Sequence, residues 1–354
     1  MMSNITLPPR YKIIDSTLGG GMGDVFKCVD IHLDRAVILK LLKSGGEERR
    51  LIDEQKALSK LRSKHVVQIF DFTSVKVDGE TRDALVLEFI AGEELHYNKK
   101  YEIIDIIKLL WQVACGLSDV HGAYIIHRDI KPNNILKDIN GVVKILDFGL
   151  ARNDGKDALT RSIIGTPGYM APELFRSGQV SFDNKVDVYA FGALAIDLLG
   201  LERPAELDSF PPSEVYLFNE LYKKTPKIIA DVIMGCISVD KLKRPDMLDV
   251  KNILERFLLK DKHNALVIMG NQKHKISSTS NRAKINWGGG SSMVIAYDGF
   301  EFIVDSINGI AKVNNINVVV GYILRGCSVI TLERADSSQR IFVTFDISNP
   351  EVMS

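Results

Sequence analysis

Residues 127–134 read His-Arg-Asp-Ile-Lys-Pro-Asn-Asn, and residues 147–149 read Asp-Phe-Gly. The first stretch follows Ile103–His121, a long segment whose apolar residues recur at helical spacing. The second follows a short apolar run at Val142–Leu146, which predicts a strand. The sequence therefore sets two acidic residues and an amide into loops beside a predicted helix and a predicted strand.

These side chains suit phosphoryl transfer. Asn134 and Asp147 offer the hard oxygen ligands that Mg²⁺ prefers alongside substrate phosphates. Asp129 would accept or orient the proton of an attacking hydroxyl, and Lys131 would lie near the transferred phosphoryl charge. Each residue alone is more often a solvated loop charge or a turn former, but together, in this order and spacing, they indicate a phosphoryl-transfer site.

A glycine-rich stretch lies upstream, where Leu18-Gly-Gly-Gly-Met-Gly-Asp-Val25 separates two predicted strands. Without side chains, the backbone N–H groups of such a turn can approach phosphates closely. Alone, the stretch is equally consistent with a flexible hairpin.

Lys40 ends the apolar run Arg35–Lys40. A lysine there is costly to bury unless phosphate oxygens or a carboxylate pair with it. Glu54 lies on the next predicted helix, Glu47–Leu61, so we predict a Lys40–Glu54 pair. A strand-end lysine that extends its ammonium group to solvent is the commoner case when nothing else is known.

The ordered set of motifs resembles the eukaryotic-type protein kinases, over roughly residues 10–260. That family combines a glycine-rich loop, a strand lysine, His-Arg-Asp with an Asn five residues later, Asp-Phe-Gly and Ala-Pro-Glu. The last motif stands here at residues 171–173. Asp187-Val-Tyr-Ala-Phe-Gly192 resembles the helix whose aspartate braces the catalytic loop, and Arg244 resembles the arginine that pairs with the glutamate Glu173. The triple-glycine run resembles bacterial or bacteriophage members.

The resemblance implies a role for each motif residue. Lys40 would hold the α- and β-phosphates of ATP with Glu54 fixing it, Asp129 would be the catalytic base, and Asn134 and Asp147 would hold Mg²⁺ or Mn²⁺. The residues implied to cover the ATP phosphates are Leu18, Gly19, Gly20, Gly21, Met22, Gly23 and Val25. The residues implied to form the hinge that binds adenine are Leu87, Glu88 and Ile90.

One position departs from the family pattern. Counting back from Val25, Leu18 stands where the family has its first glycine. The loop is either one residue shorter, with Gly19 taking that place, or lacks the first glycine, which affects loop geometry and ATP affinity but removes no catalytic residue.

Lys131 and Thr166 resemble the serine/threonine branch, so the implied acceptor is a Ser or Thr hydroxyl on a protein, with tyrosine or dual specificity as an alternative. The segment from Asp147 to Glu173 would be the activation segment. We predict autophosphorylation at Thr160 or Ser162, with the added charge ordering the segment against Arg128. The alternative is a polar loop that carries no phosphate.

The predicted fold class is α+β, a bilobal kinase domain at residues 10–262 with a β-rich N-lobe (10–90) and a helical C-lobe (91–262). Short alternating runs fill residues 265–354, and Asp298-Gly299 between two of them signals a hairpin, so an all-β, sandwich-like domain is expected there. It lacks the Gly-Arg, Ser and His set of forkhead-associated domains, and we expect a docking module.

Composition narrows the function classes. Lys+Arg and Asp+Glu are both 45, so there is no basic surplus of the kind that nucleic-acid binders show. The four cysteines form no CxxC pair, which favours free thiols in a reducing cytoplasm over a zinc site or disulfides. No run of about 18 apolar residues is present, so we expect a soluble protein without a membrane span.

Three function classes remain open. The first is an active protein serine/threonine kinase that uses ATP. The second is a pseudokinase scaffold, which only the irregular glycine loop supports, because Lys40, Asp129, Asn134 and Asp147 are all present. The third is a small-molecule phosphotransferase, a class that lacks the Ala-Pro-Glu segment found here.

Overall fold

The computed structural model describes residues 5–15, 25–42, 59, 61–148, 152–153, 159–160, 166–175, 180–181, 183–333 and 340–352. The chain forms two compact units, here called unit 1 (through Leu254) and unit 2 (Glu255–Met353). None of the helices within the described residues has an apolar stretch long enough to cross a membrane.

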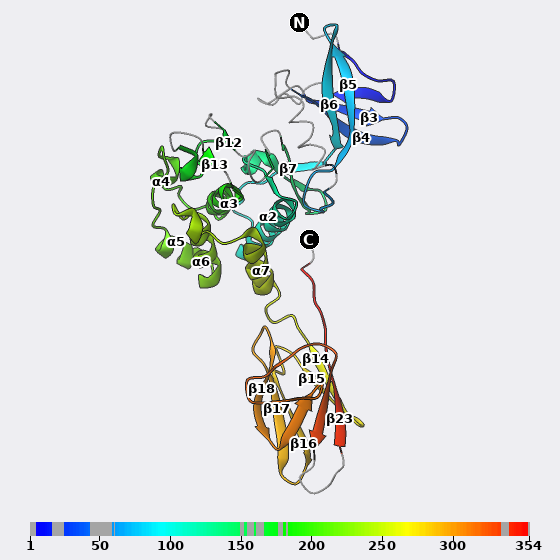
Figure 1. Cartoon of the computed structure of the whole chain (residues 1–354), viewed down its shortest axis with the longest axis vertical. Coiled ribbons are helices and arrows are strands. Elements are labelled where there is room, and N and C mark those ends of the chain that lie inside the picture. The colour runs from blue at the N-terminus through cyan, green and yellow to red at the C-terminus, as the bar shows by residue number, and fades with distance from the viewer. Residues whose placement is uncertain are drawn as a thin grey trace. The chain divides into compact units, whose positions relative to one another are not determined.

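Unit 1 begins with a six-stranded antiparallel sheet (Figure 1) in the order β1-β5-β6-β4-β3-β2. Its strands are β1 (Ile5–Thr6), β2 (Tyr11–Asp15), β3 (Val25–Asp30), β4 (Arg35–Leu41), β5 (Ile69–Val77) and β6 (Glu80–Glu88). The apolar residues at Val66–Phe72 predict a strand, and the strand found, β5, begins at Ile69 and extends to Val77. In its second half, the exposed Lys76 lies between buried Val75 and Val77, so this part has no continuous apolar run. The hairpin that follows turns at Asp78 and Gly79, both with positive φ.

Alternation along β4 decides where its lysine points. Val37, Leu39 and Leu41 are fully buried in the core on one face of the sheet. Since successive side chains point to opposite faces of a strand, Lys40 lies on the other face, and it is paired in register with Val25 of β3.

The rest of unit 1 is mainly helical. Its helices are α2 (Ile103–Gly122), α3 (Lys185–Leu198), α4 (Ala205–Asp208), α5 (Phe218–Lys224), α6 (Lys227–Cys236) and α7 (Met247–Leu258), which runs on into unit 2. The 3₁₀ turns are η1 (Pro132–Asn134), η3 (Pro172–Phe175) and η4 (Lys241–Lys243). The short strands are β7 (Gly92–Glu94), β8 (Ile125–Ile126), β9 (Ile135–Asp138), β10 (Val143–Ile145), β11 (Arg152–Asn153), β12 (Leu159–Thr160) and β13 (Val180–Ser181).

Helix α3 is the centre of this helical part. It is buried almost all round, including Tyr189 and Phe191, and it packs against α2 and α6. A helix apolar on every side belongs in the interior. Apolar spacing in the sequence predicts helices at 103–121, 185–199, 213–222, 227–237 and 247–258. Four of them agree with the structure within one residue at each end, whereas the third is found as α5, which begins only at Phe218.

Unit 2 is an all-β sandwich of two sheets, in the orders β15-β14-β23-β22-β19-β20 and β16-β17-β18-β21. Its strands are β14 (Ala265–Met269), β15 (Gln272–Ile276), β16 (Arg282–Gly288), β17 (Ser291–Tyr297), β18 (Phe302–Asn308), β19 (Ile310–Val313), β20 (Ile316–Asn317), β21 (Ile323–Leu324), β22 (Ser328–Glu333) and β23 (Arg340–Ile347). Both sheets contribute to one apolar core, with Ile295 and Phe345 at 0% exposure. The hairpin predicted at Asp298-Gly299 joins β17 to β18.

Candidate active site

Lys40 and Asp147 form an ion pair, in which Lys40 Nζ donates to Asp147 Oδ1. Asp147 follows β10 and adopts a positive φ of 50°, an uncommon backbone conformation for a residue other than glycine. Both side chains are mostly buried, at 13% and 24% exposure. The arrangement places an ammonium group and a carboxylate side by side, one from the sheet and one from the loop after β10.

Asp129 lies at the centre of a hydrogen-bonded cluster and is only 4% exposed. Asn134 Nδ2 donates to the Asp129 backbone oxygen at 2.7 Å and to Oδ2 at 2.8 Å. Lys131 Nζ lies 2.8 Å from the same Oδ2. Thr166 Oγ1 donates to Oδ1 at 2.8 Å and accepts from Lys131 Nζ at 2.7 Å. These bonds fix the plane of the carboxylate, and Thr166 brings the far end of the activation segment against it.

Asp187, on α3, braces the loop that carries Asp129. Its carboxylate accepts from the backbone N–H of His127 at 2.8 Å and of Arg128 at 2.7 Å, and it lies 2.9 Å from His121 Nε2. Complete burial by itself raises the pKa of Asp187, but the contacts with His121, His127 and Arg128 outweigh it and hold the pKa below its usual range. The brace sustains Arg128 at a positive φ of 73°.

Asn134 and Asp147 are brought close through the backbone. The N–H of Leu146, the residue before Asp147, donates to the Asn134 carbonyl at 2.8 Å. Because Asn134 Nδ2 is used by Asp129, its amide oxygen is left as an acceptor. An amide oxygen beside a carboxylate is a donor set that fits Mg²⁺, with substrate phosphates and water completing the shell.

The predicted hinge residues lie where β6 ends. The Glu88 N–H donates to the Gln68 carbonyl at 2.9 Å, and Glu88 Oε2 accepts from Lys144 Nζ at 2.9 Å. Ile90 lies just beyond the strand, where the described residues offer its N–H no backbone partner. Leu87 is still paired with β4, whereas Ile90 lies beyond the end of β6 and outside the sheet.

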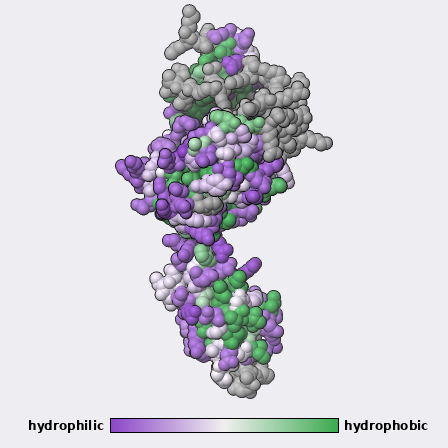
Figure 2. Space-filling model, turned by 90° about the vertical axis from the view of Figure 1, so that its left-hand side faces the viewer, coloured by the Kyte–Doolittle hydropathy of each residue, from purple (hydrophilic) through white to green (hydrophobic). Residues whose placement is uncertain are grey.

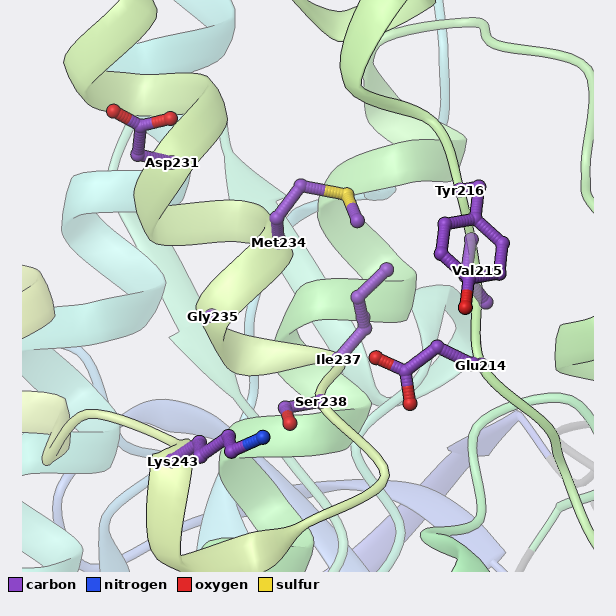
Figure 3. Close-up of a pocket in the computed structure, with 9 residues that line it drawn as sticks. All are labelled: Glu214, Val215, Tyr216, Asp231, Met234, Gly235, Ile237, Ser238 and Lys243. Atoms are coloured by element: carbon purple, nitrogen blue, oxygen red, sulfur yellow. The ribbon is translucent and has the colours of Figure 1, made fainter.

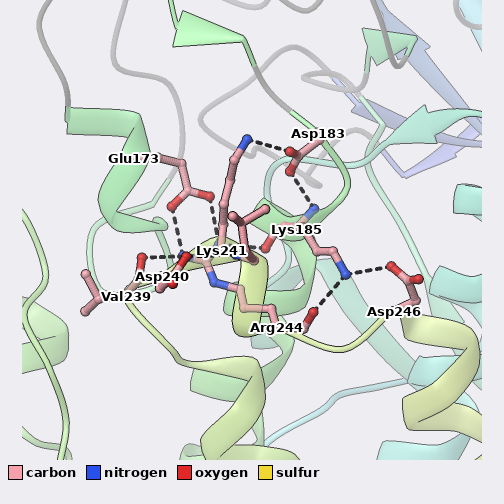
Figure 4. Close-up of polar contacts among 9 residues, drawn as sticks. Glu173, Asp183, Lys185, Val239, Asp240, Lys241, Arg244 and Asp246 are labelled. Atoms are coloured by element: carbon pink, nitrogen blue, oxygen red, sulfur yellow. Dashed lines mark hydrogen bonds and ion pairs between the residues drawn. The ribbon is translucent and has the colours of Figure 1, made fainter.

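Glu173 and Arg244 form a buried bidentate pair at 2.7 and 2.8 Å (Figure 4). Arg244 also donates to the Ser238 carbonyl at 2.8 Å and the Lys185 carbonyl at 2.9 Å. Asp183 lies beside this pair and accepts from Lys241 Nζ at 2.6 Å. The predicted pairing of Arg244 with the Ala-Pro-Glu glutamate is confirmed, and it ties η3 to the turn before α7.

Several predicted site residues lie outside the described residues: Leu18, Gly19, Gly20, Gly21, Met22, Gly23, Glu54 and Ser162. Thr160 is described only through its backbone, which pairs with Val180 between β12 and β13. The predicted Lys40–Glu54 pair is therefore untested.

The structure adds contacts that the sequence analysis did not assign. The sequence relates Thr166 only to the class of acceptor, whereas in the structure it bonds directly to Asp129. His121 was assigned no role, and a histidine at the end of a predicted helix gives no signal by itself. A surface cavity of about 320 Å³ near the end of α6 (Figure 3) contains none of the predicted site residues. Its lining residues are Glu214, Val215, Tyr216, Asp231, Met234, Gly235, Ile237, Ser238 and Lys243.

Comparison with known proteins agrees with this geometry. Residues 13–256 match the protein kinase domain. The chain is 35% identical over 227 residues to the serine/threonine-protein kinase pkn3 of Myxococcus xanthus, covering 58% of this chain and 40% of that protein. It is 30% identical over 256 residues to a probable serine/threonine-protein kinase of Clostridium acetobutylicum (67% and 38%), and 33% identical over 203 residues to PrkC of Bacillus subtilis (54% and 30%).

The matched relatives are bacterial, as the glycine-rich stretch suggested, and they are longer proteins. The aligned region spans 40% or less of the length of each of these three relatives. The kinase motifs, the brace from α3 and the buried Glu173–Arg244 pair all lie within the matched region. On these grounds the chain belongs to the protein kinase family, and its similar relatives carry the name of serine/threonine-protein kinases.

Proposed function

We propose that this chain transfers the γ-phosphate of ATP to Ser or Thr hydroxyls of proteins. The observation that carries the proposal is the bonding of Thr166 to both Asp129 and Lys131. It sets the end of the activation segment, where an acceptor would lie, against a carboxylate that can take a proton and an ammonium group that can offset phosphate charge.

In the proposed reaction, Asp129 accepts the proton of the acceptor hydroxyl as the new O–P bond forms. The bond between the γ-phosphorus and the bridging oxygen breaks, and ADP leaves with that oxygen. Lys131 offsets charge on the transferred group, and Lys40 orients the α- and β-phosphates after exchanging its contact with Asp147 for them. Most of the rate gain comes from positioning and electrostatic stabilisation rather than covalent chemistry.

A divalent cation, Mg²⁺ or Mn²⁺, would be held by Asn134 and Asp147 and would neutralise charge on the phosphates. A divalent cation bound there would compete with the single ammonium group of Lys40 for the Asp147 carboxylate. The Ile90 backbone and the end of β6 would bind adenine.

The test is a transfer assay with labelled ATP and Mg²⁺ that compares wild type with Asp147→Asn, followed by phosphoamino-acid analysis. Label on Ser or Thr in wild type alone supports the proposal. Label on Tyr would overturn the acceptor class. No label from folded wild type, with a generic protein substrate present, would favour a scaffold, and ATP-binding calorimetry would then report whether the cleft still holds nucleotide.

We further propose that Thr160 or Ser162 is phosphorylated by the kinase itself. Arg128 is buried and braced through its backbone by Asp187, so a phosphate drawn to it would order the activation segment against a rigid loop. Mass spectrometry of active protein that finds neither site occupied would contradict this.

Unit 2 is proposed to dock protein substrates. Figure 2 shows apolar side chains gathered on a face of this unit, and its exposed apolar residues include Ile316, Val319, Val320 and Phe342. Exposed apolar patches often mark interaction sites. Deleting residues 265–354 is expected to spare transfer to a generic peptide and to weaken phosphorylation of the natural substrate; equal rates on that substrate would refute the docking role.

We also infer a cytoplasmic location, because ATP is available there and the cysteines are free thiols. Burial raises the pKa of the Cys28 thiol to about 11 and that of Cys236 to about 12, so both remain protonated and packed as small apolar groups. Cell fractionation that placed the protein in an oxidising compartment would contradict this location.

A further inference from the structure

Arg203, in the turn between α3 and α4, holds three different groups at once. Its Nη1 lies 2.6 Å from Asp197 Oδ1, and its Nε lies 2.9 Å from Asp208 Oδ1. Its Nη2 donates to the backbone oxygen of Gly168. Asp197 belongs to α3, Asp208 to α4 and Gly168 to the segment before η3, so one guanidinium joins three parts of unit 1.

Tyr169 completes this cluster, which we call the Arg203 clamp (Gly168, Tyr169, Asp197, Arg203 and Asp208). Tyr169 Oη donates to Asp197 Oδ2 at 2.5 Å, and the Arg203 guanidinium lies 4.8 Å from the centre of the Tyr169 ring. Burial, followed by the hydrogen bond to Asp197, raises the pKa of Tyr169, so the phenol stays protonated and remains a donor.

The clamp reaches the catalytic carboxylate through a single turn. The Tyr169 N–H donates to the Thr166 carbonyl at 3.1 Å, which closes the turn from Thr166 to Tyr169. Thr166 is the residue that bonds to Asp129 and Lys131. Arg203 holds the far end of that turn by its backbone at Gly168 and by the ring at Tyr169.

Glycine suits the backbone at position 168. Its φ is +85°, a conformation that favours glycine. A Cβ there would lie 2.6 Å from Arg203 Nη2 and 2.8 Å from Asp208 Oδ1. A larger residue here would strain the backbone and push the ends of the Arg203 and Asp208 side chains away from Gly168.

We propose that Arg203 is a positioning residue for phosphoryl transfer: by fixing the turn from Thr166 to Tyr169, it sets where the acceptor hydroxyl lies relative to Asp129. This inference rests on the proposed function. The three hydrogen bonds of Arg203 all go to members of the clamp, so Arg203 would act on the reaction through the turn rather than by touching substrate. The planar guanidinium offers donors in several directions, which the single ammonium of a lysine cannot reproduce.

The test compares Arg203→Ala, Arg203→Lys and Tyr169→Phe in the full chain, with myelin basic protein as acceptor. The kcat and the KM values for acceptor and for ATP are measured separately, and circular dichroism checks folding. We expect Arg203→Ala to lower kcat/KM for the acceptor by about 10- to 100-fold, because small misplacements of a reacting group are costly. The KM for ATP should stay within about twofold of wild type, since the turn does not hold nucleotide.

Arg203→Lys should recover only part of the lost kcat/KM for the acceptor. Tyr169→Phe should lower this kcat/KM by less than Arg203→Ala does, and it should likewise leave the KM for ATP nearly unchanged. Arg10→Ala is the matched control, because Arg10 also pairs with two aspartates, Asp30 and Asp71, but in the N-terminal sheet. It should lower thermal stability and leave the acceptor KM unchanged.

Two results would overturn the inference. One is a folded Arg203→Ala protein with the acceptor kcat and KM of wild type. The other is a loss that scales only with the fraction of folded protein, or that raises both KM values together, since either would mean a structural role alone. A wild-type chain that labels no protein would contradict the proposed function itself, before any variant is compared.

Discussion

Around the loop from His127 to Asn134, unit 1 buries charged and amide side chains, whereas the core of unit 2 is apolar. The buried polar residues of this part of unit 1 are His127, Arg128, Asp129, Asn134, Glu173, Asp187 and Arg244. In the described part of unit 2, the buried polar residues are the hydroxyl-bearing Ser291, Ser328 and Thr331.

The difference separates two uses of a protein interior. A buried charge is costly unless it is paired and hydrogen-bonded, and an ion pair is often no more stabilising than apolar residues of the same volume. The apolar interior of unit 2 is of the kind that stability alone favours. In unit 1 the unfavourable desolvation of buried charges is offset by hydrogen bonds and ion pairs, which is expected where side chains must be held at fixed positions for chemistry.

The largest expected effect is that of Asp147→Asn. It keeps the size of the side chain and removes the charge that pairs with Lys40 and would hold the metal ion. We expect transfer to fall by at least about 10³-fold, in line with the several kcal/mol that a metal ion supplies to such reactions. The matched control is Asp305→Asn in unit 2, where Asp305 pairs with Arg282 on the surface and should be dispensable. Wild-type rates for Asp147→Asn would show that the metal assignment is wrong.

Asp129→Asn tests the base. Because the amide cannot take the hydroxyl proton, we expect kcat to fall by about 10²–10⁴-fold, the usual contribution of a general base. Because Thr166 and Lys131 both bond to this carboxylate, the substitution could also disturb folding. Thermal unfolding of the variant checks that it is folded. A folded variant with unchanged kcat would remove Asp129 from the mechanism.

Asp187→Asn should lower both activity and stability. The two oxygens of the carboxylate each accept one N–H, from His127 and from Arg128, whereas an asparagine offers one oxygen and turns a donor NH₂ group toward the other N–H. A hydrogen bond to a charged group contributes about 1.5–3 kcal/mol. Since the pKa of Asp187 lies below its usual range, its contribution is present above the ordinary Asp pKa and is lost as pH falls through the folded-state value. The free energy of unfolding, measured at a series of acidic pH values, should fall more steeply with decreasing pH in wild type than in the variant. Parallel curves of free energy against pH would contradict this.

The smallest effect is expected in unit 2. Ile295 is fully buried in its apolar core, so Ile295→Val should cost about 0.5–1.5 kcal/mol of unfolding free energy through the missing methylene. Transfer to a generic peptide should not change. A measurable fall in that activity would show that the interior of unit 2 is linked to the candidate catalytic residues, against the division between the two units drawn above.

Much of the site could be predicted from the sequence because the chemistry needs particular residue types in order. The loop from His127 to Asn134 and the Asp147 that follows are brought together as expected, and the Glu173–Arg244 pair is confirmed. The roles assigned to these residues in transfer stay predictions. What the sequence did not indicate was the pairing of Lys40 with Asp147, which lies 107 residues away.

The Arg203 clamp lay beyond sequence reasoning for a physical reason. Asp197 lies near the end of a buried helix and Arg203 in a turn, and each by itself resembles a solvated surface charge. Only the folded chain brings Gly168 to Arg203 across 35 residues. In unit 2 the alternating apolar pattern predicted strands but could not give their order, in which β14 pairs with β23.

The brace at Asp187 has a consequence for how the protein is made. The ribosome releases His127 and Asp129 well before the carboxylate that holds their loop, which lies 60 residues downstream of His127. A nascent chain that ends before α3 therefore carries the base, the lysine and the predicted metal ligands but lacks the support that aligns them. Because chains grow at about 5–20 residues per second, several seconds separate the synthesis of the loop from that of its brace. A chain truncated before α3 is therefore expected to lack the hydrogen bonds that hold this loop in place.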